Sequence, residues 1–205
     1  MLNVKCAVFG SLAKNCYLIT DKKSGHSALV DCTEYSEKMR DFIGDADLEY
    51  ILLTHGHFDH IGGVKDVKAS TNAKVVIAAE DELMLSSGKH SLAAFCGAKQ
   101  NDTAADIIVD DGDEIILGES KIRVMKTQGH TDGCVCYVCD DKLFSGDTLF
   151  FCSCGRTDFP TGSSAKMLNS LKKLAALDGD YIVYPGHDRQ STLEFERKNN
   201  PYMNR

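Results

Sequence analysis

The stretch Thr-His-Gly-His-Phe-Asp-His at residues 54–60 constrains this chain more than any other feature of its sequence. It places three of the seven histidines and one aspartate within six residues, directly after the apolar run at residues 50–53. Neutral imidazole is the commonest metal ligand in proteins, and a neighbouring carboxylate suits a divalent cation such as zinc, iron or manganese. A His-rich surface loop is the ordinary alternative, but three histidines in so short a window favour a metal site.

Three later positions offer the same kind of side chain at the end of a predicted strand. They are His130, Asp147 and His187, and each directly follows a glycine. Glycine allows the chain to turn sharply or to approach a ligand closely. Each position alone is typical of a hydrogen-bonded loop histidine or a Gly-Asp turn. Together with the first stretch they supply five histidines and two aspartates at strand ends, which predicts one shared site.

The apolar runs predict two groups of strands, each followed by helices. The expected strands lie at residues 4–9, 16–20, 27–31, 50–53 and 74–78, and then at 114–117, 122–127, 135–139, 142–145 and 181–184. The expected helices lie at residues 34–43, 63–69, 80–85 and 164–177, with a last one from about 192. Residues 86–106 show no clear pattern, and we interpret this long irregular segment as a lid or binding loop. The pattern is typical of an α/β protein with two sheets packed face to face and helices outside.

The composition of the chain argues against two kinds of partner, nucleic acid and membrane. The formal net charge of −7 argues against a nucleic-acid partner, since phosphate binding requires clustered Lys and Arg. No apolar run approaches the ~20 residues of a membrane helix, and residues 1–10 resemble a first strand rather than a signal peptide. We therefore expect a cytoplasmic protein with one domain over residues 1–205, and neither nucleic acid nor a membrane as partner.

The nine cysteines predict buried core thiols rather than a disulfide framework. Cys136 and Cys139 form a C-x-x-C, which in other contexts is a zinc or redox motif. Here the pair lies in a run with strong strand propensity, and an extended chain directs two such thiols to opposite faces. Inert thiols in the core are therefore the favoured interpretation.

The ordered motifs Thr-His-Gly-His-Phe-Asp-His, Gly-His-Thr, Ser-Gly-Asp-Thr-Leu and Pro-Gly-His resemble those of the metallo-β-lactamase fold hydrolases. The resemblance covers nearly the whole chain and implies a four-layer αββα sandwich of two mixed sheets. The segment Cys-Gly-Arg-Thr-Asp-Phe-Pro at residues 154–160 and the tail at 196–201 are similar to the short glyoxalase II-like branch, which hydrolyses hydroxyacylglutathione. The related persulfide dioxygenases share the Cys-Gly-Arg-Thr-Asp-Phe segment.

The resemblance implies a set of ligands for two divalent metal ions. Zinc is the expected metal, and iron and manganese are the alternatives. His55, His57 and His130 would hold one ion. The second ion would be held by Asp59, His60 and His187, with Asp147 between the two. Asp59 and Asp147 are thus the predicted catalytic residues.

By the same resemblance, a hydroxide shared by the two ions would attack the carbonyl of a small acyl thioester or ester. Arg156 is the candidate for substrate binding, because glyoxalase II enzymes carry a basic residue there that contacts glutathione; its alternative is a structural pair with Asp158. A mononuclear iron persulfide dioxygenase, another ester or lactone hydrolase of this superfamily, and a non-catalytic metal-binding module stay open. The oligomeric state is open as well.

Overall fold

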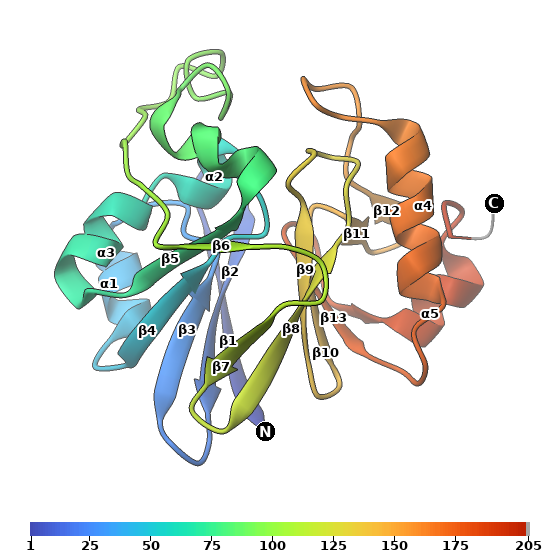
Figure 1. Ribbon diagram of the computed structural model, residues 1–205, viewed down its shortest axis with the longest axis horizontal. Helices are drawn as coiled ribbons and strands as arrows, with labels where there is room; N and C mark the ends of the chain where they lie inside the picture. The colour runs from blue at the N-terminus through green and yellow to red at the C-terminus, as the bar shows by residue number, and fades with distance from the viewer. Residues whose placement is uncertain (204–205) are drawn as a thin grey trace.

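Two six-stranded sheets make up the centre of the computed structural model, which describes residues 1–203 (Figure 1). The first sheet has the order β1 (Leu2–Phe9), β2 (Lys14–Asp21), β3 (His26–Val30), β4 (Asp47–Leu52), β5 (Lys74–Ala78) and β6 (Ile107–Val109). The second has the order β14 (Ser191–Thr192), β13 (Ile182–Pro185), β10 (Lys142–Gly146), β9 (Val135–Cys139), β8 (Ser120–Lys126) and β7 (Glu114–Leu117). Parallel and antiparallel pairs occur in each sheet, so both are mixed.

Helices cover the outer faces of both sheets (Figure 1). α1 (Glu37–Ile43) and α3 (Val64–Thr71) lie against the first sheet, and α4 (Ser164–Ala175) and α5 (Leu193–Asn199) against the second. The short elements α2 (Phe58–Ile61), η1 (Ala79–Ser86), β11 (Leu149–Phe150) and β12 (Ser153–Cys154) belong to the connections between strands. The predicted layering of two mixed sheets between outer helices is therefore confirmed. No helix within residues 1–203 is long and apolar enough to cross a bilayer.

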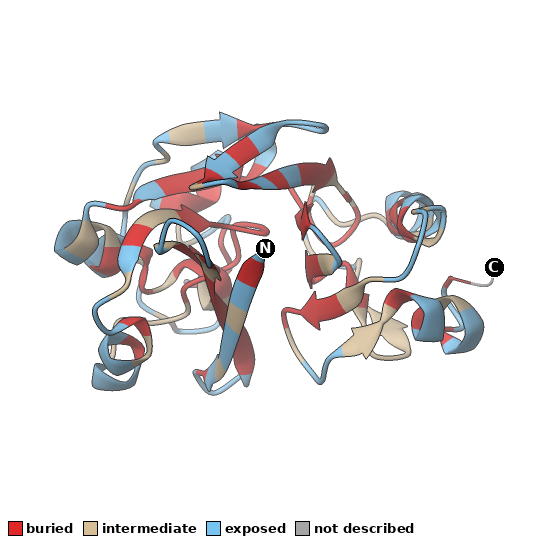
Figure 2. Ribbon diagram, turned by 90° about the horizontal axis from the view of Figure 1, so that it is seen from below, coloured by how far each residue is buried: buried red, intermediate tan, exposed pale blue. Residues whose placement is uncertain are grey.

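Three apolar clusters correspond to the three interfaces between these layers. The central one joins side chains of both sheets, including Tyr17 and Tyr137, whose hydroxyls donate to the carbonyls of Pro185 and Leu53. The other two lie beneath the outer helices, and buried residues line the facing sheets in Figure 2. The Cys136 and Cys139 thiols belong to different clusters, as expected for an extended chain. The sandwich thus buries apolar surface on both faces of each sheet.

Local chemistry explains where some elements differ from the predicted ranges. The helix predicted at 34–43 begins at Glu37, because the Ser36 hydroxyl accepts from the amide of Met39 and caps it. The helix predicted at 80–85 is a 3-10 helix over Ala79–Ser86. Residues 87–106 contain no helix or strand, and the three-residue strand β6 that follows them had no counterpart in the prediction.

The direction of the strands brings their carboxyl ends to a common edge. β8 and β10 are both antiparallel to β9, and β13 is parallel to β10, so these three strands of the second sheet end on the same side. The sheets are joined there by backbone hydrogen bonds from Val135 to Thr54 and from Asn15 to Gly186, 2.9 and 2.8 Å long. The loops that carry the predicted ligands consequently meet at one edge of the sandwich.

Candidate metal centre

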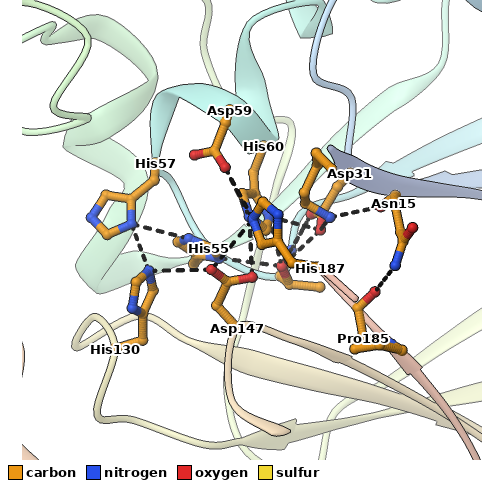
Figure 3. Close-up of polar contacts among 12 residues, drawn as sticks. Asn15, Asp31, His55, His57, Asp59, His60, His130, Asp147, Pro185 and His187 are labelled. Carbon is orange, nitrogen blue, oxygen red and sulfur yellow. Dashed lines mark hydrogen bonds and ion pairs between the residues drawn. The ribbon is translucent and has the colours of Figure 1, made fainter. Parts of the chain in front are cut away.

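All seven predicted ligands lie together at this edge (Figure 3). Their ligand atoms form three overlapping groups, each with all atoms within 4.8 Å of one another. We call His55, His57 and His130 the first group, and Asp59, His60 and His187 the second group. His55, His60 and Asp147 make up the remaining group, which overlaps these two. The loop after β4 supplies four of these residues, and the loops after β8, β10 and β13 supply one each. Residues separated by more than 70 positions in the sequence, such as His57 and His130, thereby become neighbours.

The first group is a buried cluster of three imidazoles. His57 Nδ1 lies 2.8 Å from His130 Nε2 and 3.1 Å from His55 Nε2. Two nitrogens bound to one tetrahedral zinc ion are about 3.3 Å apart, so these separations are close to those of a metal site. Burial, together with the neighbouring histidines, lowers the pKa of His57 to about 3 and that of His55 well below its ordinary value. Both rings therefore keep the lone pairs that a metal requires.

The second group adds carboxylates. Asp59 Oδ2 lies 3.2 Å from His187 Nε2 and 3.7 Å from His60 Nε2. Asp147 lies between the groups: its Oδ1 is 3.3 Å from His60 Nε2, and its Oδ2 is 3.6 Å from His130 Nε2. Burial alone would raise the pKa of Asp147, but the surrounding histidines hold this pKa well below its usual range. Asp147 is therefore an ionised carboxylate in contact with both groups.

Hydrogen bonds on the outer side of three rings fix which nitrogen faces the centre. In each case Nδ1–H donates to an oxygen and leaves Nε2 for the interior. The three pairs are His60 with the Asp31 carboxylate at 2.8 Å, His130 with the Arg156 carbonyl at 2.7 Å, and His187 with the Leu12 carbonyl at 3.0 Å. Metal-binding histidines are commonly oriented in this way.

Two buried atoms at the centre make no hydrogen bond within residues 1–203. They are His60 Nε2 and Asp147 Oδ1, which face each other. Leaving buried polar atoms without partners is costly, and a cation between them would satisfy both. The backbone also fits tightly here, because a Cβ on Gly186 would lie 2.2 Å from Asp147 Oδ1. The donor set and these two atoms therefore fit divalent metal ions.

A buried lysine lies behind the second group. Lys14 Nζ is 3.0 Å from Asp31 Oδ2, and both side chains are almost completely inaccessible to solvent. Asp31 also accepts from the amide and hydroxyl of Thr54. Burial would lower the pKa of His60, but Asp31, Asp147 and Asp59 offset that effect and raise the pKa to about 9. The metal-free His60 ring is thus held as a cation among carboxylates.

A cavity of about 530 Å³ opens onto both groups. His57, Asp59, His130, Asp147 and His187 contribute to one side of it. The remaining wall is mainly apolar and is formed by Leu12, Phe58, Leu92, Cys96, Phe150, Ser153, Cys154, Arg156 and Phe159. A small organic molecule could therefore bind beside the metal ligands with an apolar portion against the wall.

Arg156 lies at this cavity and is paired with Asp158. Its Nε and Nη2 donate to the two oxygens of Asp158, both at 2.7 Å, and its guanidinium lies 4.1 Å from the centre of the Phe159 ring. The side chain is exposed. Both sequence interpretations, a structural pair and a substrate contact, are compatible with this position.

Sequence reasoning missed the residues that orient the ligands. Asp31 directly follows β3 as Asp147 follows β10, so a carboxylate at a strand end was a usable signal, but no glycine precedes Asp31. Asp31 instead adopts a left-handed backbone conformation with φ of 58°. Asp81 was likewise inconspicuous within a predicted helix, although its side chain is fully buried. The carbonyls of Leu12 and Arg156 act through the backbone and carry no residue-type signal.

Two mixed sheets with outer helices and a histidine–aspartate centre at their common edge define a metalloprotein of the αββα class. The chain belongs to the metallo-β-lactamase superfamily, whose family model matches residues 10–187. This match includes every predicted ligand and confirms the family resemblance of the sequence motifs.

Relatives and solved structures agree with this assignment. Hydroxyacylglutathione hydrolase GloC from Haemophilus influenzae is 28% identical over 99% of both chains. The crystal structure of the BLEG-1 B3 metallo-β-lactamase matches with a TM-score of 0.91 and 28% identity, covering 99% of both chains. The structure of TTHA1623 in a di-iron-bound form matches with a TM-score of 0.85 and 29% identity over 97% of this chain and 100% of the other.

Proposed function

We propose that this protein is a dinuclear metal-dependent hydrolase of a small acyl thioester. The observation that carries the proposal is the convergence of seven metal-type side chains on two groups that share Asp147 as neighbour. The similarity to a hydroxyacylglutathione hydrolase along the whole chain supports a thioester as the substrate class. The di-iron-bound relative supports a centre for two ions.

His55, His57 and His130 would hold one ion, and Asp59, His60 and His187 the other, with Asp147 between them. We propose zinc, with iron or manganese as alternatives, because imidazole and carboxylate ligands accept all three. Bound in this way, the ions would lower the pKa of a water molecule towards neutrality and polarise a carbonyl group. No serine or cysteine nucleophile is needed for such a reaction.

The chain's own residues then provide orientation and substrate binding. The outer hydrogen bonds of His60, His130 and His187 keep their Nε2 atoms directed at the centre. The apolar wall of the cavity would bind the acyl chain and keep bulk water away from the carbonyl carbon of the thioester. Arg156, at the same cavity, would bind an anionic part of the thiol portion.

A mononuclear iron persulfide dioxygenase is the alternative that the Cys-Gly-Arg-Thr-Asp-Phe segment keeps open. Such a centre would use His55, His130 and Asp147 and would leave a second group of ligands without an ion. The complete second group, with its own oriented histidines, favours the hydrolase.

The test is a substrate panel with purified protein loaded with each metal in turn. We expect release of free thiol from acyl thioesters, including S-acylglutathiones, and loss of that activity in His57→Ala and Asp147→Ala variants that still fold. Esters, lactones and a β-lactam belong in the same panel. Protein that carries two ions yet cleaves no thioester would contradict the proposal. Oxygen uptake that depends on a persulfide, in the iron-loaded form, would favour the dioxygenase instead.

A further inference from the structure

Asp81 lies outside both ligand groups, yet its side chain is completely buried next to them. Its carboxylate accepts three hydrogen bonds. Oδ2 accepts from the Gly56 amide at 3.0 Å and the Thr131 hydroxyl at 2.7 Å, and Oδ1 accepts from the Gly133 amide at 3.0 Å. A buried carboxylate with three donors and a fixed orientation constrains every group that it binds.

The three donors belong to the two loops that make up the first ligand group. Gly56 separates His55 from His57 in the loop after β4 of the first sheet. Thr131 directly follows His130 in the loop after β8 of the second sheet. The Asp81 carboxylate is therefore a direct link between the backbone that carries two ligands and the loop that carries the third.

The packing around this carboxylate is close. A Cβ on Gly133 would lie 2.4 Å from Asp81 Cγ. A Cβ on Gly56 would lie 2.6 Å from the Cβ of Met84, which belongs to the same 3-10 helix as Asp81. Both loops therefore approach η1 at positions where a side chain does not fit, and neither can shift towards it.

We propose that Asp81 is a positioning residue that sets the separation of His55 and His57 from His130 and so determines the metal affinity of the first group. The inference rests on the proposed metal centre but not on the identity of the substrate. Without the three hydrogen bonds, the two loops are joined around the first group by fewer contacts. His130 then departs more easily from the 2.8 Å separation that it keeps from His57.

Asp81→Asn is the informative variant because it keeps the size of the side chain. The amide replaces one acceptor by a donor, which then faces an N–H or O–H group of the loops. We expect the first group to bind its ion roughly 10- to 100-fold more weakly, as is usual when a residue that orients metal ligands is changed. Thr131→Val removes one of the three hydrogen bonds to Asp81, together with the contact of the hydroxyl with Cys134 Sγ, and should have a smaller effect in the same direction. Thr131→Ser keeps the hydroxyl and should bind the ion nearly as wild type.

Asp21 offers a matched control within the same chain. Its side chain is also buried and also links the two halves, accepting from Ser24 N at 3.1 Å, Glu119 N at 3.2 Å and Ser120 Oγ at 2.9 Å. Glu119 and Ser120 lie at the start of β8 and Ser24 lies between β2 and β3, whereas His130 lies beyond the end of β8. Asp21→Asn should therefore lower stability without altering metal affinity.

The experiment is a competition titration of metal-free protein with Zn²⁺ against a chromophoric chelator, in a His187→Ala background that removes a ligand of the second group. Thermal unfolding of each metal-free variant measures the structural cost separately. We expect Asp81→Asn to weaken zinc binding far more than Asp21→Asn at a comparable loss of melting temperature. Equal zinc affinities in the two variants, or a Thr131→Val affinity equal to that of Thr131→Ser, would overturn the positioning role. If Asp81→Asn does not fold, the two Thr131 variants decide the question. Zinc binding that is intact in wild type but accompanied by no thioester cleavage would contradict only the proposed substrate. A wild type that binds neither zinc nor iron nor manganese would overturn the metal centre together with this inference.

Discussion

Asp31 Oδ2 lies 2.8 Å from Nδ1 of His60, and this contact determines which nitrogen of the ring faces the second ligand group. The carboxylate can only accept, so Nδ1 must carry a proton and Nε2 is the nitrogen that an ion would bind, after displacing its proton. Lys14 in turn balances the charge of Asp31 from 3.0 Å away. The predicted ligand His60 is thus oriented by an ion pair that does not itself reach the centre.

Replacing Asp31 by asparagine should weaken binding of the second ion by roughly 10- to 100-fold, because the amide holds the His60 tautomer less firmly. It should also lower the free energy of unfolding by about 3 kcal/mol or more, since Lys14 would keep a buried charge without a partner. Zinc titration and denaturant unfolding measure the two effects. Asp106→Asn is the control: this carboxylate likewise pairs with a lysine, Lys68, and accepts from a backbone amide, but far from the ligands.

The double variant Lys14→Met with Asp31→Asn separates the two consequences. Removing the uncompensated lysine should restore much of the lost stability. Metal affinity should stay low, because nothing in the double variant holds the ring as the carboxylate does. Recovery of metal binding together with stability would show that Asp31 acts only through the fold.

The two ligand groups should respond differently to pH. The raised pKa of His60, about 9, means that an ion binding to the second group must displace a proton below that pH. Its affinity should therefore rise by about tenfold per pH unit as pH increases from about 7 towards 9. In the first group the pKa values of His55 and His57 are lowered, so neither of these two rings has a proton to lose in this range.

The same displacement has a consequence for the metal-free fold. The raised pKa of His60 stabilises the folded state fully below the unfolded value of about 6.5, and this contribution is lost as pH rises through about 9.

Stepwise affinities measured by calorimetry at about pH 7 and about pH 8.5 test the predicted pH dependence of metal binding. Two steps with the same pH slope would contradict it.

The sequence predicted which seven side chains converge at one edge, because their residue types are distinctive and four of them are close together in the chain. His55, His57, Asp59 and His60 lie within one loop, and the remaining ligands follow strands whose apolar character is easy to recognise. The layering followed from the same strands. What the prediction lacked was chiefly information on long-range contacts and on short elements. β6 has three residues and is stabilised as a strand by pairing with β5, which is a tertiary contact.

The residues that orient the ligands illustrate a different limit. His130 is held by the carbonyl of Arg156 and His187 by the carbonyl of Leu12, and any residue type supplies a carbonyl. Asp81 binds two loops that are 25 and 50 or more positions away in the sequence. Composition and periodicity carry no trace of such contacts, so only the folded chain reveals them.

The cysteines should differ sharply in reactivity. Burial raises the pKa of both Cys136 and Cys139 to about 11, and both are inaccessible in the core. Cys96 is exposed and lies at the cavity. We expect an aromatic disulfide reagent to modify Cys96 rapidly in the native protein, with the C-x-x-C thiols reacting only after unfolding. Cys6 is the other exposed thiol, so the double variant Cys6→Ser with Cys96→Ser should lose the fast phase. Early modification of Cys136 or Cys139 would contradict their placement in the core.

Arg156 provides the sharpest test of how the substrate is bound. Because its side chain is exposed and its ion pair with Asp158 is open to water, Arg156→Gln should hardly change the melting temperature. If the guanidinium binds an anionic part of the substrate, the variant should raise KM roughly fivefold for charged thioesters and leave kcat unchanged. Asp158→Asn should lower KM for charged thioesters, because it frees the guanidinium from its bidentate partner. A neutral thioester serves as the control substrate, and an equal rise of KM for both substrates would show that Arg156 shapes the cavity rather than binding charge.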